Sequence, residues 1–404
     1  MSVIFWLSLW VIGYTFAGYP VVLRVINVFR SSARKRRERE QQRRNAPRPS
    51  EMRGRRDEPV VTQRKEAPLP TMSIVLVVYN EAERIEARIE NLAQCSYQGP
   101  RELIVVCGGC TDDTADRARR WSGDLEVRVI EREGRKGKAA GLNEGVAAAR
   151  GEILVFADAR QRFNRHALRK LVAPFADAEV AGVSGNLEIA ASDDGAGAGI
   201  DAYWKLEKLI RKLESDGDSV IGCTGAIYAL RRSIFDPIPE DTILDDVVIP
   251  MQAVMDGKRV LFESEAIAFD PQSLSPEKER RRKIRTLAGN YQMLFRYPAW
   301  LNPLKNRTWW QVISHKYLRL AGPFFLAACL VSSAWLARES GFYRLAFFGQ
   351  LACYGLAVLG MVFRGVRSPV FTAPAGFVFL QWQGLRALFH YLRLRRSTEA
   401  GVWS

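Results

Sequence analysis

The sequence predicts an α/β domain with a mainly parallel sheet that helices cover on both faces, with membrane segments at both ends of the chain. Short β-branched apolar runs alternate with helix-period segments between residues 72 and 175. One apolar stretch of spanning length precedes this region, and two follow it. A strongly basic segment comes directly after the first apolar stretch. Together these features predict a membrane-bound protein with one sizeable globular domain.

The chain opens with an apolar run at residues 3–29 that is long enough to cross a bilayer, although Pro20 and Arg24 interrupt its second half. A cleaved signal peptide is the alternative. No charged segment precedes the run, and no clear small-residue cleavage site ends it. We therefore interpret residues 1–29 as a transmembrane anchor.

Residues 30–70 are charged, contain proline and are poor in large apolar side chains, so we expect a flexible linker. Between Arg30 and Arg56 twelve Lys or Arg stand against three Glu, within a chain of formal net charge +15. A basic segment beside an apolar one favours the cytoplasmic face and anionic lipid. No aromatic residues interleave the charges, so we expect no nucleic acid partner.

The domain predicted for residues 71–298 begins with four strand–helix pairs. The strands are expected at 73–79, 102–107, 125–130 and 152–157, and the helices at 81–92, 112–121, 138–149 and 165–175. Buried strands that alternate with helices imply right-handed crossovers and parallel pairing. Ligands of such sheets bind at the carboxyl ends of the strands, so the residues directly after each strand are the binding candidates.

The remaining chain is predicted to be membrane-associated. We expect an interfacial segment at 299–316 and a transmembrane hairpin over 317–364, built from the apolar stretches 317–337 and 345–363. Two buried core helices are the alternative for the hairpin. Residues 365–404 are expected to form a basic tail and an interfacial or third membrane segment, because polar residues and Pro374 interrupt the apolar stretch 370–392.

Five short segments follow strands or open helices: VYNE at 78–81, GGCTD at 108–112, EGRKGK at 133–138, FADAR at 156–160 and LDD at 244–246. Their order and spacing resemble the family 2 glycosyltransferases, whose nucleotide-sugar domain has the fold called GT-A, over about residues 72–295. The membrane-bound polysaccharide synthases are the most similar subgroup in layout. The resemblance implies a GT-A domain with N- and C-terminal transmembrane helices and a hexosyltransferase activity.

On the donor side, the resemblance implies that Tyr79, Asn80 and Glu81 receive the nucleotide base and ribose. Asn80 has a simpler alternative role as a helix cap. In the second loop the resemblance implies a donor contact by Asp112, while Gly108 stands where the family has its first acid.

Near the diphosphate, the resemblance implies that Lys138 contacts phosphate at the start of a helix, where the helix dipole also favours an anion. A solvated charge run is the alternative. Asp158 occupies the position of the family's metal-binding acid, so the resemblance implies a Mg²⁺ or Mn²⁺ ion there. Arg160 replaces the second acid of that motif and is a candidate phosphate contact instead.

On the acceptor side, the resemblance makes Asp246 the catalytic base that takes the proton from the attacking hydroxyl, with inversion at the anomeric carbon and Asp245 beside it. An acidic helix start is the alternative for both acids. Gly225 lies in a glycine-rich stretch that resembles the segment under the acceptor. Arg282 and Arg285 keep the spacing of a motif of the processive synthases, and an interfacial basic helix is their alternative.

We therefore predict a multi-pass inner-membrane glycosyltransferase that uses a nucleotide-diphosphate sugar, with a uridine nucleotide preferred, and a glycan or lipid-linked acceptor at the cytoplasmic face. Any long polymer would require a polysaccharide-export partner or self-assembly. A nucleotide-binding scaffold without turnover is one alternative. A thiol-disulfide oxidoreductase using Cys107 and Cys110 is another, because the pair lies between a strand and a helix. No G-x-G-x-x-G follows the first strand, which excludes a plain dinucleotide-binding dehydrogenase.

Overall fold

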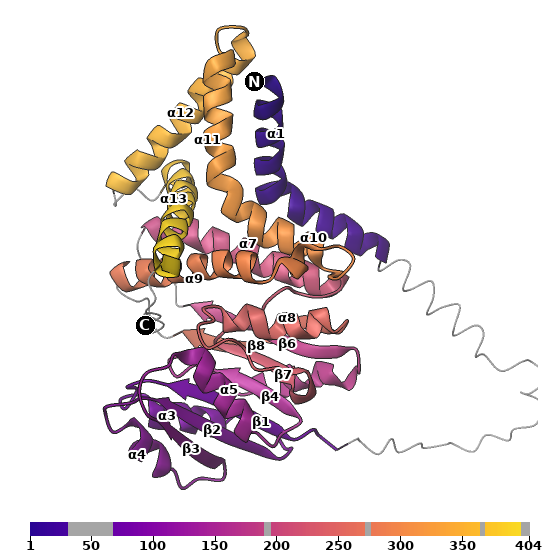
Figure 1. Ribbon diagram of the computed structural model, residues 1–404, viewed down its shortest axis with the longest axis vertical. Coiled ribbons are helices and arrows are strands. Elements are labelled where there is room, and N and C mark those ends of the chain that lie inside the picture. The colour runs from indigo at the N-terminus through magenta and orange to yellow at the C-terminus, as the bar shows by residue number, and fades with distance from the viewer. Residues whose placement is uncertain (31–67, 190–194, 271–275, 364–367, 397–404) are drawn as a thin grey trace, which may run out of the picture.

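The computed structural model describes residues 1–30, 68–189, 195–270, 276–363 and 368–396, and it has three tiers (Figure 1). A sheet domain forms one end, upright helices form the other, and a tier of crosswise helices lies between them. Most of the predicted basic linker lies outside the described residues.

One eight-stranded sheet runs through the domain in the order β3-β2-β1-β4-β7-β6-β8-β5. β1, β2, β3 and β4 pair with one another in parallel, as the strand–helix alternation predicted. β7 runs antiparallel to both β4 and β6, so the whole sheet is mixed. The strands are β1 Met72–Val78, β2 Arg101–Gly108, β3 Glu126–Arg132, β4 Ile153–Ala157, β5 Arg162–Phe163, β6 Val180–Ile189, β7 Ile227–Arg231 and β8 Arg259–Asp270.

Helices cover both faces of the sheet because alternate residues of each buried strand point to opposite sides. Ile74 and Leu76 of β1 belong to a core with α3 (Ile85–Ala93), α4 (Thr114–Arg119) and α6 (Ala167–Val172). Val75 belongs to a second core with α5 (Lys138–Ala148) and α8 (Asp245–Met255). The second core holds α5 and α8 on the same face of the sheet, and both helices begin with predicted site residues, Lys138 in α5 and Asp245 and Asp246 in α8.

The α5 helix lies unusually close to the sheet because two glycines face it. A Cβ atom on Gly141 would come within 2.7 Å of Val77, and one on Gly145 within 2.6 Å of Val75. These distances are shorter than a methyl group tolerates. The two glycines therefore set the height of α5, and with it the position of Lys138 at its first turn.

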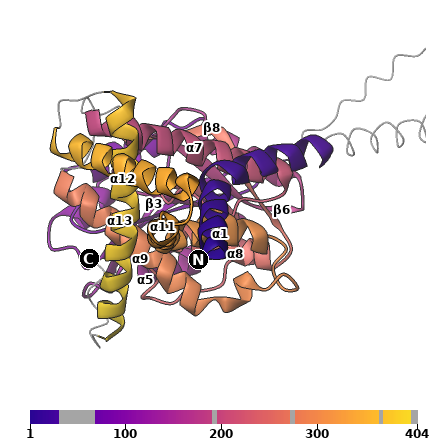
Figure 2. The ribbon, with the colours of Figure 1, turned by 90° about the horizontal axis from the view of Figure 1, so that it is seen from above.

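The crosswise tier contains α7 (Gly195–Gly217), α9 (Pro276–Arg296) and the short α10 (Trp309–Gln311). Above it stand α1 (Ser2–Gly13), α11 (Leu318–Leu336) and α12 (Gly341–Val362), and Figure 2 shows α1 next to α11 from above. α13 (Pro369–Arg396) packs against α9 and α12. Short helical turns complete the chain: η1 Tyr14–Gly18, η3 Ala173–Ala176, η4 Arg232–Ile234, η5 Pro298–Leu301 and η6 Val312–Tyr317.

Three helical stretches are long and apolar enough to cross a membrane: Ser2–Arg30, Trp309–Leu336 and Gly341–Val362. They match the anchor and the hairpin predicted from the sequence. α13, as far as the structure describes it, is not among the helices that are long and apolar enough to cross a membrane.

The N-terminal stretch bends at η1, where the helix loosens to a π turn, and its second half lies along α7 (Figure 1). Leu23 is buried against Ile210, and the Tyr19 hydroxyl donates a 2.6 Å hydrogen bond to Glu214. The Asn27 amide donates to the Leu213 carbonyl at 2.7 Å. The predicted anchor is therefore a bent helix whose second half is docked on the crosswise tier.

Candidate active site

One cavity of about 1160 Å³ starts at the carboxyl ends of β1 and β4, passes the first turns of α5 and α8, and reaches the candidate membrane helices. It unites most of the residues predicted from the sequence, although these come from distant parts of the chain. The predicted residues that line it are Tyr79, Glu81, Lys138, Asp158, Gly225, Asp245, Asp246, Arg282 and Arg285.

Asn80 and Asp112 do not line this cavity and instead hold two loops together. Asn80 has a φ of 52°, and its side chain accepts a 2.9 Å bond from the Thr111 amide and donates a 3.0 Å bond to the Thr111 hydroxyl. Asp112 accepts bonds from the amides of Thr114 and Ala82, and the Thr114 hydroxyl bond in particular lowers its pKa. Asn80 is not a helix cap, because α3 begins only at Ile85. The donor contacts predicted for Asn80 and Asp112 stay predictions.

The end of the cavity next to β1 has a flat aromatic surface. Tyr79 is 39% exposed, and the Arg135 guanidinium lies 4.2 Å from the centre of its ring. Beside it, Glu81 and Arg84 form a 2.8 Å ion pair. An aromatic face with a planar cation and a carboxylate acceptor suits the stacking and hydrogen bonding of a nucleoside. The sequence reasoning missed Arg135, because nothing local indicates that its loop folds over Tyr79.

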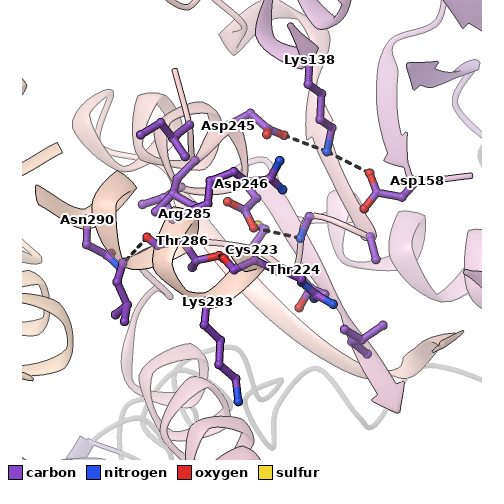
Figure 3. Close-up of a pocket in the computed structure, with 18 of the residues that line it drawn as sticks. Lys138, Asp158, Cys223, Thr224, Asp245, Asp246, Lys283, Arg285, Thr286 and Asn290 are labelled. Carbon is purple, nitrogen blue, oxygen red and sulfur yellow. Dashed lines mark hydrogen bonds and ion pairs between the residues drawn. The ribbon is translucent and has the colours of Figure 1, made fainter. Parts of the chain in front are cut away.

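Lys138 lies between two carboxylates in the middle of the cavity (Figure 3). Its ammonium is 2.9 Å from Asp158 and 3.3 Å from Asp245. Burial opposes the charge on Lys138, but Asp158 and Asp245 outweigh that effect and raise its pKa. Figure 3 shows the side chains of Lys138, Asp158 and Asp245 converging on one point, from the start of α5, the end of β4 and the start of α8.

Burial raises the pKa of Asp245 to about 6, with Lys138 opposing the shift and Asp246 adding to it. One Asp245 oxygen is buried and has no well-aligned hydrogen bond, although it faces the Lys138 ammonium. A divalent cation placed where that ammonium lies would meet both Asp158 and Asp245. Mg²⁺ usually binds through one or two carboxylates and substrate phosphates, so the two acids fit a catalytic divalent ion. The described residues contain no cluster of three or more His, Cys, Asp or Glu side chains suited to a metal.

Arg160, which replaces the second acid of the metal motif, lines the cavity but is bound by Asp270 of β8. Gln161 donates to the same buried carboxylate at 3.1 Å. The Arg160 charge is thus matched within the protein, which holds the guanidinium at the cavity wall.

Asp246 lies next to Asp245, and its carboxylate is held by the glycine-rich segment. The Gly225 amide donates to it at 3.2 Å, and the Cys223 amide donates to the Asp246 carbonyl at 2.7 Å. A Cβ atom on Gly225 would lie 3.0 Å from the same carboxylate oxygen. Gly225 therefore allows the amide contact and leaves Asp246 half-buried at the cavity wall.

A second group of charged residues borders Asp246 and was not found from the sequence. Arg211 of α7 donates to the Thr224 hydroxyl at 2.7 Å and pairs with Glu207 at 3.2 Å. Glu207 also binds His315 at 2.9 Å and Arg319 at 2.8 Å. Burial alone would raise the pKa of Glu207, but its contacts with His315, Arg319 and Arg211 lower that pKa well below the ordinary range. The i,i+4 spacing of Glu207 and Arg211 was a local signal, but it does not reveal that the pair faces the site.

The cysteine pair considered for redox chemistry has the wrong environment for it. Cys107 is buried, and burial together with Cys110 raises its pKa to about 12. Redox-active thiols instead have lowered pKa values. The oxidoreductase alternative therefore has no support in this structure.

Comparisons with known proteins agree with this geometry. Residues 73–238 match the family model described as glycosyl transferase family 2. The chain is 23% identical over 236 residues to poly-beta-1,6-N-acetyl-D-glucosamine synthase of Staphylococcus aureus (strain COL), covering 56% of each chain. It is 21% identical over 254 residues to the synthase of that name from Staphylococcus epidermidis, covering 62% of this chain and 59% of the relative. The chain thus spans less than two thirds of the length of these curated relatives.

A solved structure extends the likeness to the membrane helices. The mannosyltransferase PcManGT from Pyrobaculum calidifontis, in complex with GDP-Man and Mn²⁺, superposes with a TM-score of 0.62 at 22% identity. The alignment covers 91% of this chain and 99% of that one, which supports a common fold. The family match and this fold lead to one conclusion: residues 73–238 match glycosyl transferase family 2, and the chain has the GT-A fold.

Proposed function

We propose that this protein is an inverting glycosyltransferase that moves a hexosyl group from a nucleoside diphosphate donor to a hydroxyl of a glycan or lipid-linked acceptor at the cytoplasmic face of the membrane. One observation carries the proposal. A single cavity contains the Tyr79 surface, the convergence of Lys138 with two carboxylates, and Asp246 held by Gly225.

In the proposed reaction the acceptor oxygen bonds to the anomeric carbon as the bond to the donor diphosphate breaks. Asp246 takes the hydroxyl proton, while the Gly225 amide keeps the carboxylate oriented. Lys138 lies where its charge meets the departing diphosphate. A Mg²⁺ or Mn²⁺ ion held by Asp158 and Asp245 would supply further positive charge to that leaving group.

The proposal names the donor only as a nucleoside diphosphate hexose and does not assign one sugar. We prefer a uridine nucleotide, as the sequence comparison with polysaccharide synthases suggested, whereas the solved mannosyltransferase was crystallised with GDP-Man. A polysaccharide-export partner also stays a prediction.

The test is donor turnover by the detergent-solubilised full chain with UDP-, GDP- and dTDP-sugars, with and without Mn²⁺ or Mg²⁺. Asp246→Asn should lower kcat/KM by about 10² to 10⁴, the usual contribution of a general base. Asp256→Asn, at the exposed end of the same helix, is the matched control and should retain activity. Donor binding without turnover in the wild-type protein would instead favour the scaffold alternative. Equal activity of Asp246→Asn and the control would rule out Asp246 as the base.

A further inference from the structure

The cavity that contains Asp246 also reaches the helices beyond the sheet domain. At that end it is lined by Phe16 of the bent N-terminal helix, Leu320 of α11, and Phe377 and Leu380 of α13. Phe16 and Phe377 meet edge to face, with ring centres 4.9 Å apart. The inner end of the site is therefore apolar, and two of the three helices that border it, Ser2–Arg30 and Trp309–Leu336, are long and apolar enough to cross a membrane.

Lys316 lines the same cavity as Asp246 and the apolar residues Phe16, Leu320 and Phe377. It belongs to η6, a six-residue π turn at the start of the membrane-spanning stretch Trp309–Leu336. π turns are rare and often occur at functional sites, because the extra residue redirects a side chain. Lys316 directly follows His315, whose ring binds Glu207 and Glu214 at 2.9 Å each. Glu207 also pairs with Arg211, which donates to Thr224, and the next residue, Gly225, binds Asp246.

The carboxylates near Lys316 are already engaged by other groups. Glu207 binds His315, Arg211 and Arg319, and Glu214 binds His315 and Tyr19. No carboxylate lies within 4.0 Å of the Lys316 ammonium in the part of the chain that the structure describes. A half-buried lysine in a cavity, with its acidic neighbours taken, offers a site for an anion from outside the protein.

Resting on the proposed function, we infer that the acceptor is a membrane lipid with a phosphate in its head group. Lys316 binds the phosphate, the apolar chain lies between η1, α11 and α13, and a hydroxyl of the same head group reaches Asp246. Transfer then joins this hydroxyl oxygen to the anomeric carbon and breaks the bond from that carbon to the diphosphate. The proton goes to Asp246, and the nucleoside diphosphate leaves with the bonding electrons.

The apolar end of the cavity, Lys316 and Asp246 would each bind a different part of one lipid molecule. The apolar end suits a hydrocarbon chain, since burying it there removes apolar surface from water on both partners. The compact ammonium of Lys316 suits a phosphate oxygen. Asp246 and Lys316 line the same cavity, so one head group can present its phosphate to Lys316 and its hydroxyl to Asp246.

Binding of lipid to the full chain in neutral detergent micelles, without donor, tests the inference independently of turnover. The probe is phosphatidylglycerol with a fluorescent acyl chain. Lys316→Met should weaken its binding about tenfold or more, as expected for loss of a charged hydrogen bond. Lys316→Arg should retain most of the affinity. Lys305→Met, at an exposed lysine outside the cavity, is the matched control and should bind like the wild type.

Two further arms identify the source of the phosphate. Fluorescent diacylglycerol, which has no phosphate, should bind more weakly than phosphatidylglycerol and should not respond to Lys316→Met. Ala373→Trp, which fills the apolar end, should weaken phosphatidylglycerol binding while leaving glycerol 3-phosphate binding unchanged. These arms remain decisive if Lys316→Met does not fold.

Three results would overturn the inference: equal lipid binding by Lys316→Met and wild type, equal binding of diacylglycerol and phosphatidylglycerol, or displacement of the lipid by equimolar inorganic phosphate. None of them bears on donor turnover or on the effect of Asp246→Asn. Failure of the lipid inference and failure of the proposed function are therefore distinguishable.

Discussion

At the scale of single residues, Lys138 and the metal ion predicted for this site have the same two acidic partners. The Lys138 ammonium contacts Asp158 and Asp245, and a bound cation would take its position. Lys138 would then be released toward the donor diphosphate, which the cation also binds. The ion pairs of the donor-free protein thus keep both carboxylates in place until donor and metal arrive.

The raised pKa of Asp245 predicts that metal binding depends on pH. Because this pKa is about 6, Asp245 is protonated below that value and its affinity for a cation falls. We expect Mn²⁺ affinity to decrease up to about tenfold per pH unit below about pH 6, as measured by electron paramagnetic resonance of free Mn²⁺. Asp245→Asn should bind weakly at every pH, and Asp256→Asn should behave like the wild type. Mn²⁺ affinity that is constant from pH 5 to pH 8 would contradict this.

The same shift has a defined effect on stability. The folded protein holds the Asp245 proton more tightly than the unfolded chain, whose ordinary pKa is 3.8. Ionisation of Asp245 therefore lowers the free energy of unfolding as pH rises from about 4 to about 6. A buried carboxylate whose ionisation lowers the stability of the protein is typical of a functional site.

Gly225 predicts a steric effect on Asp246, the proposed catalytic base. An added methyl group at Gly225 would press on the Asp246 carboxylate at 3.0 Å, whereas one at Gly222 would meet the Val247 side chain at 3.1 Å. Gly225→Ala should therefore reduce kcat about tenfold or more, since misplacing a catalytic group by a fraction of an ångström is costly. Gly222→Ala, with a similar contact away from the carboxylate, should reduce it much less. Steady-state kinetics with saturating donor measures both, and equal losses would speak against the predicted role of Gly225.

At the scale of elements, the bent N-terminal helix joins the membrane tier to α7. Its second half is docked through Leu23 and through Tyr19, whose hydroxyl reaches Glu214. Glu214 in turn binds His315 at the start of the α11 stretch. The bend thus connects two membrane segments to the helix that carries Arg211, next to the catalytic end of the cavity.

This docking predicts that substitutions on the two faces of the helix change the stability of the protein by different amounts. Leu23 is 4% exposed, while Val21 is 61% exposed. Leu23→Ala should destabilise the protein by about 2 kcal/mol or more, because it removes buried apolar surface and leaves a cavity. Val21→Ala should change little. Thermal unfolding in detergent measures both changes, and equal Tm values for the two variants would show that the second half is not docked.

At the scale of the whole molecule, the arrangement predicts a topology. The N-terminus and the turn between α11 and α12 lie together at the end of the molecule farthest from the sheet domain (Figure 1). If α1, α11 and α12 cross the bilayer, these two points share one side and the sheet domain lies on the other. The basic residues after Arg30 favour the cytoplasm for the sheet domain.

Cysteine labelling in intact cells checks this topology. Ser2→Cys and Ser340→Cys should react with a membrane-impermeant maleimide added from outside. Asp256→Cys, in the sheet domain, should react only after the membrane is permeabilised. The opposite pattern would place the catalytic domain outside and remove it from cytoplasmic nucleotide sugars.

Much of the fold was predictable because its signals are local. The four strand–helix pairs of residues 72–176 appear within a few residues of their predicted limits, since buried strands and amphipathic helices have different periods. The helix ends were less accurate. The first helix begins at Ile85 instead of residue 81, because Asn80 and the following residues form a turn that is held to Thr111 and Asp112.

What the sequence by itself determined is the order of chemical groups along the chain: Tyr79 after the first strand, Lys138 opening a helix, Asp158 after the fourth strand and Asp246 opening another. Only the tertiary structure decided the antiparallel direction of β7, the bend at η1, and the meetings of Arg135 with Tyr79 and Lys138 with Asp245. The reason is physical. A strand or helix leaves a periodic record in its own residues, whereas a contact between distant side chains depends on packing that no single segment encodes.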